Sequence, residues 1–207
     1  MKVFVNRFKP APFVILITIA SLLFVSGCAR YARNVNTLYN PSATVRGGSG
    51  ELYVVIPGNL QTHSEGVKWV LGKVKNDDNI VIDEIISPRS PAEIIQSALV
   101  LEFNRAGYTV IPVTKRPAAA QQVIDLTKAE IELEQISDLA NLKVKCRVLA
   151  GLDIYKNGQH VKRVQYESTA SRTDIKDRDL LAKNVLEDAL KSLMREAVPE
   201  LHTMLKQ

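Results

Sequence analysis

Two segments in the middle of the chain alternate strictly between apolar and charged residues, and this pattern constrains the fold more than any other feature. Residues 129–134 read AEIELE, and residues 142–148 read LKVKCRV. Alternation with a period of two is typical of a strand that has one buried face and one solvent-exposed face. The chain therefore predicts a sheet that is covered on one side.

The two segments predict an antiparallel hairpin whose exposed face carries opposite charges. One register pairs three acidic residues with three basic residues, and it also aligns Leu133 with Val144 and Ile131 with Cys146. Because both faces favour the same register, we expect it in the fold. The basic stripe is then a neutralised sheet face and not a site for phosphate or lipid headgroups. The expected charged pairs are Glu134 with Lys143, Glu132 with Lys145 and Glu130 with Arg147.

A second hairpin is predicted at Asn157-Gly158, because a type I′ turn needs positive φ at both central positions. The return strand covers residues 160–173. With regular alternation, several of its apolar residues would point away from the core. We therefore predict a β-bulge near Lys162-Arg163 that turns these side chains back to the core face. These residues are Val164, Tyr166 and Ala170.

Two helices are expected beside these strands. The first begins at an N-cap, Ser90, which forms a capping box with Glu93, and it ends at Gly107. The second covers about residues 176–205, where Pro199 should kink or break it. Its apolar residues recur at helical spacing and predict a helix that lies on the sheet. They are Leu181, Val185, Ala189, Leu193 and Leu201.

Shorter apolar segments predict further strands at residues 52–56, 68–75, 80–82 and 108–112. The elements together predict an α+β fold, with a mixed, mainly antiparallel sheet and two main helices packed on one face. We expect a single domain at residues 51–207.

The first 27 residues have the features of an export signal. Lys2, Arg7 and Lys9 form a positive region, and an apolar run follows at residues 13–25. That run is shorter than the ~20 residues that a membrane-spanning helix needs. A signal peptide at residues 1–27 is therefore favoured over a permanent anchor helix.

Val25, Ser26, Gly27 and Cys28 resemble the lipobox of bacterial lipoproteins. The resemblance implies that Cys28 carries lipid on its sulfur, that the chain is cut before it, and that the new amino group is acylated. Two or more acyl chains hold a protein stably on a membrane. By resemblance to enterobacterial lipoproteins, Ala29 favours sorting to the periplasmic face of the outer membrane.

Residues 28–50 lack strand or helix periodicity and are rich in polar and turn-forming residues, so we expect a lipidated cysteine followed by a flexible tether. Residues 47–50 read GGSG but lack the Lys-Ser/Thr of a phosphate-binding loop.

The chain offers little for catalysis. Without residues 1–27 it has 24 basic and 22 acidic side chains, which argues against a nucleic-acid binder. His63, His160 and His202 have no metal-ligand spacing, and Cys146 should be a buried, unactivated thiol. No pair of carboxylates is expected to have pKa values pushed apart. We therefore expect no enzyme, cofactor or metal site.

Three stretches resemble the YajG-type bacterial outer-membrane lipoproteins. They read WVLGKV at residues 69–74, FNRAGYTV at 103–110 and LLAKNVLEDAL at 180–190, and the resemblance covers roughly residues 66–195. It implies a small periplasmic α+β domain on a lipid anchor, and it implies no catalytic residues.

These features predict a non-catalytic interaction or scaffold module that recruits an envelope protein by strand addition to an exposed sheet edge. One alternative is an accessory lipoprotein of a lipid or envelope-component transport system, which needs an apolar groove between sheet and helices. Another is a subunit of an envelope-spanning secretion or flagellar assembly. A wall-modifying hydrolase would need a cleft with paired ionisable groups.

Overall fold

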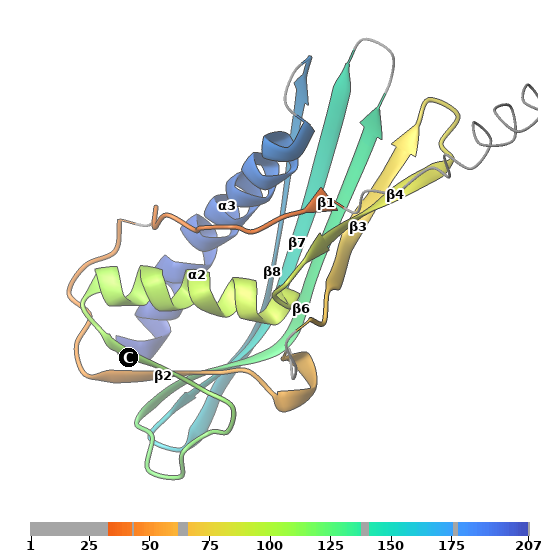
Figure 1. Ribbon diagram of the computed structural model, residues 1–207. Coiled ribbons are helices and arrows are strands. Elements are labelled where there is room, and N and C mark those ends of the chain that lie inside the picture. The colour runs from red at the N-terminus through yellow and green to blue at the C-terminus, as the bar shows by residue number, and fades with distance from the viewer. Residues whose placement is uncertain (1–32, 43, 62–65, 138–140, 176–177, 207) are drawn as a thin grey trace, which may run out of the picture. The chain divides into compact units, whose positions relative to one another are not determined.

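The computed structural model describes residues 33–42, 44–61, 66–137, 141–175 and 178–206 (Figure 1). No helix among these residues is long and apolar enough to cross a membrane. The elements in chain order are β1 (Arg33–Asn34), β2 (Glu51–Val55), the 3-10 helix η1 (Gly58–Leu60), β3 (Trp69–Asn76), β4 (Val81–Ser87), α2 (Pro91–Ala106), β5 (Thr109–Val113), β6 (Gln122–Ser137), β7 (Leu142–Lys156), β8 (Gln159–Asp174) and α3 (Arg178–Lys206).

The eight strands form one open, mixed sheet, and its longest pairings are antiparallel. Strands β6, β7 and β8 make a meander of long antiparallel neighbours. The other edge of β6 carries two parallel strands, β2 near its start and β3 near its end. Outside them, β5 pairs with β2, β4 pairs with β3, and β1 pairs with β4. Helices α2 and α3 lie on one face (Figure 1), so the α+β prediction is confirmed.

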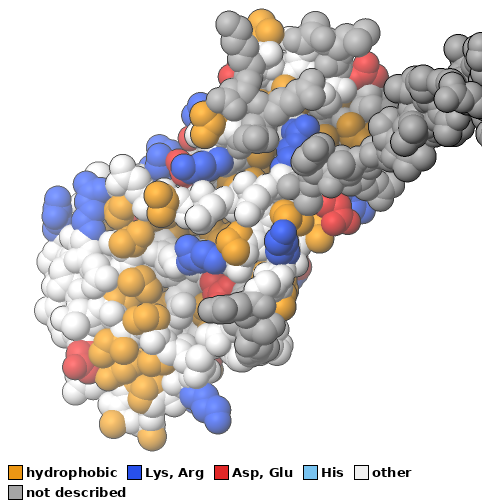
Figure 2. All heavy atoms as spheres, viewed as in Figure 1, with side chains coloured by type: hydrophobic (Ala, Val, Ile, Leu, Met, Phe, Trp, Pro, Cys, Tyr) orange, Lys and Arg blue, Asp and Glu red, His pale blue; other side chains and the backbone are white. Residues whose placement is uncertain are grey.

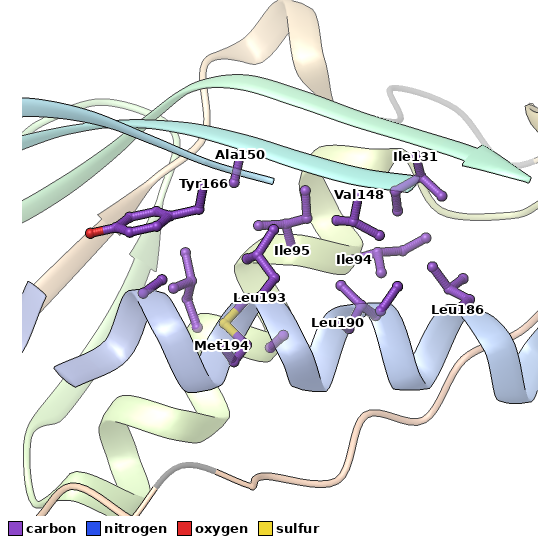
Figure 3. Packing of buried hydrophobic residues seen from close by; sticks show 14 of the residues in the cluster. Ile94, Ile95, Ile131, Val148, Ala150, Tyr166, Leu186, Leu190, Leu193 and Met194 are labelled. Carbon is purple, nitrogen blue, oxygen red and sulfur yellow. The ribbon is translucent and has the colours of Figure 1, made fainter. Parts of the chain in front are cut away.

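The core fills the space between the sheet and the two helices. Leu186, Leu190 and Leu193 of α3 point toward the sheet, and Ile94 and Ile95 of α2 lie beside them (Figure 3). The apolar stripe predicted for the last helix is buried along its whole length. Burial of apolar side chains from both helices against one sheet face is the main stabilising contribution here.

The ends of α2 are as predicted. The Ser90 Oγ accepts from the Glu93 N–H at 3.2 Å, and the Glu93 carboxylate accepts from the Ser90 N–H at 2.7 Å. Gly107 takes a φ of 111°, a left-handed value that glycine adopts at little cost.

The predicted break at Pro199 is absent, because α3 continues through this residue to Lys206. Val198 and Leu201, on either side of the proline, are fully buried. Their packing on the sheet offsets the ~3 kcal/mol that an interior proline costs a helix.

The predicted register of the first hairpin is wrong by two residues. Glu132 lies opposite Arg147, Glu134 opposite Lys145, and Leu133 opposite Cys146. A shift of two leaves every side chain on its predicted face, so the apolar face is unchanged. Exposed ion pairs contribute only ~0.2–1 kcal/mol each and do not fix a register. The pairs that do not form as backbone partners are Glu134 with Lys143, Glu132 with Lys145, Glu130 with Arg147, Leu133 with Val144 and Ile131 with Cys146.

The second hairpin is largely as predicted. Asn157 and Gly158 have φ values of 50° and 79°, which fit the expected type I′ turn. A register shift lies between the pairs Ile154–Lys162 and Tyr155–His160, so the extra residue is Val161, one position before the predicted bulge. The bulge returns Val164, Tyr166 and Ala170 to the core face, as expected.

The flexible tether predicted for residues 28–50 is wrong for the described residues 33–42 and 44–50, which we call the strap. The Val35 N–H donates to the Ile86 carbonyl at 2.8 Å, and Val35 is 2% exposed. At the far end of the strap, the Gly48 N–H donates to the Ala106 carbonyl at 2.9 Å. The folded domain therefore begins well before residue 51.

A buried carboxylate fastens the middle of the strap. Glu102 of α2 is 1% exposed, and it accepts hydrogen bonds from the Tyr39 hydroxyl and from the Ser42 N–H, the latter at 2.6 Å. Buried charged groups are retained only where such partners satisfy them. Residues far apart in the sequence thus form a clamp between strap and helix.

We expect Glu102→Ala to lower the free energy of unfolding by about 3 kcal/mol, because hydrogen bonds to a charged group contribute ~1.5–3 kcal/mol each. Denaturant titration measures the change, and amide hydrogen exchange at Ser42 reports release of the strap. The exposed Glu132 serves as the control, where Glu132→Ala should change stability little. Equal effects of the two variants would contradict the clamp.

Candidate functional site

A row of charged residues crosses three strands on the sheet face opposite the helices. Asp125 of β6 lies opposite Asp153 of β7, which lies opposite Arg163 of β8. Neighbouring side chains of these strands, such as Leu126 and Leu152, point into the main core. Since side chains alternate along a strand, the charged row faces away from the helices.

Asp153 is the centre of the row. The Arg163 guanidinium donates to both carboxylate oxygens of Asp153, Nε to Oδ1 at 2.7 Å and Nη2 to Oδ2 at 2.7 Å. His160 Nε2 lies 3.4 Å from Asp153 Oδ1. Although Asp153 is only 4% exposed, the guanidinium of Arg163 and then His160 hold its pKa below the ordinary value. This carboxyl is therefore kept ionised.

Asp125 has the opposite environment. Burial raises its pKa, the negative charge of Asp153 raises it further, and Arg116 offsets part of the increase. Its Oδ1 atom is buried without a hydrogen-bond partner among the described residues. Two facing carboxylates thus have pKa values that are pushed apart, which the sequence analysis did not expect.

The segment between β5 and β6 covers this end of the same face. The Arg116 guanidinium lies 4.0 Å from the centroid of the Tyr155 ring, and Tyr155 meets His160 edge to face at 5.1 Å. A small second apolar cluster forms beside them from Val55, Ala120 and Val123. These contacts shield the carboxylate pair from water.

Carboxylates with divergent pKa values are a feature of general acid–base sites. Here, however, Asp153 is neutralised by a two-point ion pair, and one oxygen of Asp125 is inaccessible. No group of three or more His, Cys, Asp or Glu side chains in the described part of the chain is arranged to hold a metal ion. The ion pair of Asp153 with Arg163 joins β7 to β8, whereas Asp125 adds an unfavourable charge beside it on β6.

The row was missed because its members are distant in sequence. Asp125 and Asp153 meet only through the β6–β7 register, and β6 begins at Gln122, in a stretch that lacks clear alternation. Arg116 comes from the connection between β5 and β6, and His160 from the start of β8.

The other predicted residues have simple roles where they are described. Cys146 is fully buried, and burial raises the pKa of its thiol to about 12, so the expected unactivated thiol is confirmed. His202 lies in the core with its Nδ1 2.9 Å from the Tyr108 hydroxyl, and burial lowers its pKa. His63 lies outside the described residues.

Arg147 organises the middle of the outer face. It lies 3.9 Å from Glu130, 3.4 Å from Glu132 and 2.6 Å from Glu167, and it lowers the pKa of Glu167. Glu134 pairs with Lys75 of β3 instead of a β7 lysine. The prediction that glutamates neutralise the basic residues of this face is therefore confirmed for Arg147. Its nearest partner, however, is Glu167 of β8 and not the predicted Glu130.

A groove of about 460 Å³ runs along β3, β6 and β7 beside these ion pairs. Six of its eleven lining residues are charged and the others are apolar or glycine, so the groove is a mixed surface and not a purely apolar site for an acyl chain. On the side that bears the helices, Lys and Arg side chains are dispersed among Asp, Glu and apolar ones, and they form no continuous basic patch over the described residues (Figure 2). The charged residues that line the groove are Lys73, Lys75, Glu132, Glu134, Lys145 and Arg147.

The outermost long strand of the sheet is β8. It is 16 residues long, and it pairs with β7 and with no other described strand. Four side-chain contacts between described residues hold it to α3. The Ser168 hydroxyl donates to the Ala189 carbonyl at 2.6 Å, and Arg172 pairs with Asp188 at 2.6 Å. The Tyr166 hydroxyl and the Lys162 ammonium both donate to the Glu200 carboxylate, at 2.8 Å and 3.2 Å. The edge is thus packed against α3 on one face, and β8 has no strand partner among the described residues on its other side.

The predicted anchor residues Val25, Ser26, Gly27 and Cys28 lie outside the described residues, so lipidation of Cys28 stays a prediction. The structure does describe the chain from Arg33, where β1 adds to β4 in parallel.

No family model and no curated protein matches this chain. Among solved structures, it is similar to a Xanthomonas campestris protein of the DUF330 family, with 13% identity, a TM-score of 0.47, and coverage of 86% of this chain and 98% of that one. A minor lipoprotein from Acinetobacter baumannii has 11% identity and a TM-score of 0.41, with coverage of 74% and 90%. Rare lipoprotein B from Shewanella oneidensis has 12% identity and a TM-score of 0.30, with coverage of 65% and 92%.

Two of these three proteins are described as lipoproteins, which the resemblance inferred from the sequence also implies. At this level of similarity, however, the matches do not identify a shared function. Membership of the YajG-type family stays a prediction.

We expect Asp125→Asn to stabilise the protein by about 1 kcal/mol at pH 7, because it removes a poorly solvated charge. The pKa of Asp125 is raised in the folded state. The folded state therefore binds more protons than the unfolded state between the ordinary and the raised pKa, and stability falls as pH rises through that window. The gain from Asp125→Asn should accordingly shrink as pH falls toward the ordinary pKa.

The matched control is Asp153→Asn, which should lower stability at pH 7, since the pKa of this carboxyl is depressed by Arg163. Urea unfolding at several pH values measures both variants. A loss of stability in Asp125→Asn at pH 7 would show that its charge is compensated.

Proposed function

We propose that this protein is a non-catalytic lipoprotein of the bacterial cell envelope, which acts as an interaction or scaffold module. Acyl chains on Cys28 hold it at the periplasmic face of the outer membrane, after removal of residues 1–27. The lipobox residues and the export signal before them support the anchor.

The free edge of β8 is the observation that carries the interaction role. A long edge strand offers unpaired N–H and C=O groups to an added strand from another protein. The ties of Ser168 and Arg172 to α3 keep this edge ordered before a partner arrives, which lowers the entropic cost of binding. Lys162 and Arg163 place charge at the end of β8 near the Val161 bulge, so a partner strand pairs with the part beyond Val164.

The transport alternative has weaker support. It needs an apolar groove between sheet and helices, and buried side chains of the core occupy that space (Figure 3). The groove beside Arg147 is charged. A scaffold role requires no cavity, and anchoring alone raises the local concentration of the domain near other envelope proteins.

Replacement of Cys28 tests the anchor. We expect Cys28→Ser to abolish incorporation of labelled palmitate and to remove the protein from the outer-membrane fraction, because the serine hydroxyl cannot form the thioether. The matched control is Cys146→Ala, which removes the buried cysteine and should leave labelling and fractionation unchanged. Palmitate labelling that persists in Cys28→Ser would contradict the proposed anchor.

Crosslinking in intact cells tests the edge. A photo-reactive residue at Ser171, exposed on β8, should yield a reproducible adduct with one envelope protein, identified by mass spectrometry. The same residue at Arg195, exposed on α3, is the control and should not yield that adduct. Adducts of equal yield at both positions, or none at Ser171, would contradict strand addition at β8.

A further inference from the structure

Three consecutive large apolar side chains are exposed where β4 begins. Ile80 is 59% exposed, and Val81 and Ile82 are each 44% exposed. We call these three residues the apolar corner. Single exposed apolar residues are common on soluble proteins, whereas several exposed together at one turn are a candidate contact surface.

The strap begins beside the apolar corner. Arg33 pairs with Ile85 and Asn34 pairs with Ile86, and the two strands are parallel. Because the register is parallel, Arg33 is the end of β1 that lies nearer to the start of β4, where Ile80 and Val81 are. The Val35 N–H continues the attachment with its bond to the Ile86 carbonyl.

The distance from the anchor to this attachment is short. Cys28 precedes Arg33 by five residues, and Ile80 precedes Ile85 by the same number. Five residues span at most about 18 Å when fully extended. If the strap were a free tether up to residue 50, the reach would be about 75 Å. The strap therefore removes most of the freedom that would let the domain stand off from a lipid surface.

We propose that the apolar corner rests in the surface of the bilayer that holds the acyl chains of Cys28. This inference builds on the proposed function, since it needs the lipid on Cys28. The short link brings the apolar corner to the interface, where its side chains leave water. The partner that covers the apolar corner is thus the phospholipid layer itself.

The charges around the corner select the type of lipid. Asp77 and Asp78 form the exposed turn before it, and Glu84 is exposed just after it. On β3, Lys73 lies opposite Glu84, and Lys75, opposite Val81, pairs with Glu134, so the aspartates of the turn carry the remaining charge. Anionic headgroups would repel these carboxylates, so the corner suits a zwitterionic surface. The contact is shallow, because the aspartates of the turn must stay in water.

The test uses the full, acylated chain in vesicles of zwitterionic phospholipid, some of which carry a quencher on the acyl chain. A fluorophore is attached to Val81→Cys, and the native Cys146 does not interfere because it is fully buried. The control is Gln159→Cys at the β7–β8 turn. That turn lies at the end of the sheet away from the β3–β4 turn (Figure 1), since Gln122 at the start of β6 pairs with Lys156.

We expect quenching at Val81→Cys to exceed that at Gln159→Cys several-fold, and to fall when anionic lipid replaces zwitterionic lipid. Ile80→Cys provides a second reporter if Val81→Cys fails to fold. Equal quenching at both ends, in a chain shown by mass spectrometry to be acylated and bound to vesicles, would overturn the membrane contact and leave the lipoprotein proposal intact. A chain that carries no acyl group and does not bind vesicles would instead refute the proposed function.

Discussion

The pairing of β6 with β7 governs the rest of the structure. It is one of the two longest ladders in the sheet, and β6 uses its other edge to carry β2 and β3 at separate positions. A register shift between Leu126 and Lys128 changes the parity of β6, so that Ile124 and Leu126 before it share the core face with Ile131 and Leu133 after it. Without this bulge, half of the strand would turn its apolar residues to solvent.

The same ladder creates the charged outer face. The register places Asp125 opposite Asp153 and Glu132 opposite Arg147. Acidic and basic side chains of the outer face therefore lie beside one another. Arg163 and Arg147 each neutralise acidic residues of a neighbouring strand. The outer face is thus ordered in part by ion pairs between neighbouring strands.

Features set by local sequence could be predicted, and features set by distant contacts could not. The α2 caps at Ser90 and Gly107 and the turn at Asn157-Gly158 depend on a few adjacent residues, and their local chemistry determines them. The register of β6 with β7 depends on the sum of many weak pairs, and two registers preserve the same faces. The charged row around Asp153 then follows from that register and had no local signature.

The strap shows why composition misled the tether prediction. Val35 and Thr37 are buried and alternate with exposed neighbours, which is a strand pattern. Leu38, however, is exposed and polar residues fill the inward positions, so hydropathy alone hides the alternation. The partner of Tyr39 and Ser42 is Glu102, about sixty residues away, and no pattern within the segment indicates it.

The order of the strap's contacts also has a mechanical consequence. A pull on the membrane anchor is applied at the N-terminal end of the strap, so it loads β1 and Val35 first, then the clamp at Glu102, and last the bond of Gly48. Each contact that breaks would free a few residues of the strap, and β4 and α2, to which the strap is bonded, bear the load until it breaks. With the anchor proposed for Cys28, the reach of the domain from the membrane would grow in steps, from about 18 Å to about 75 Å.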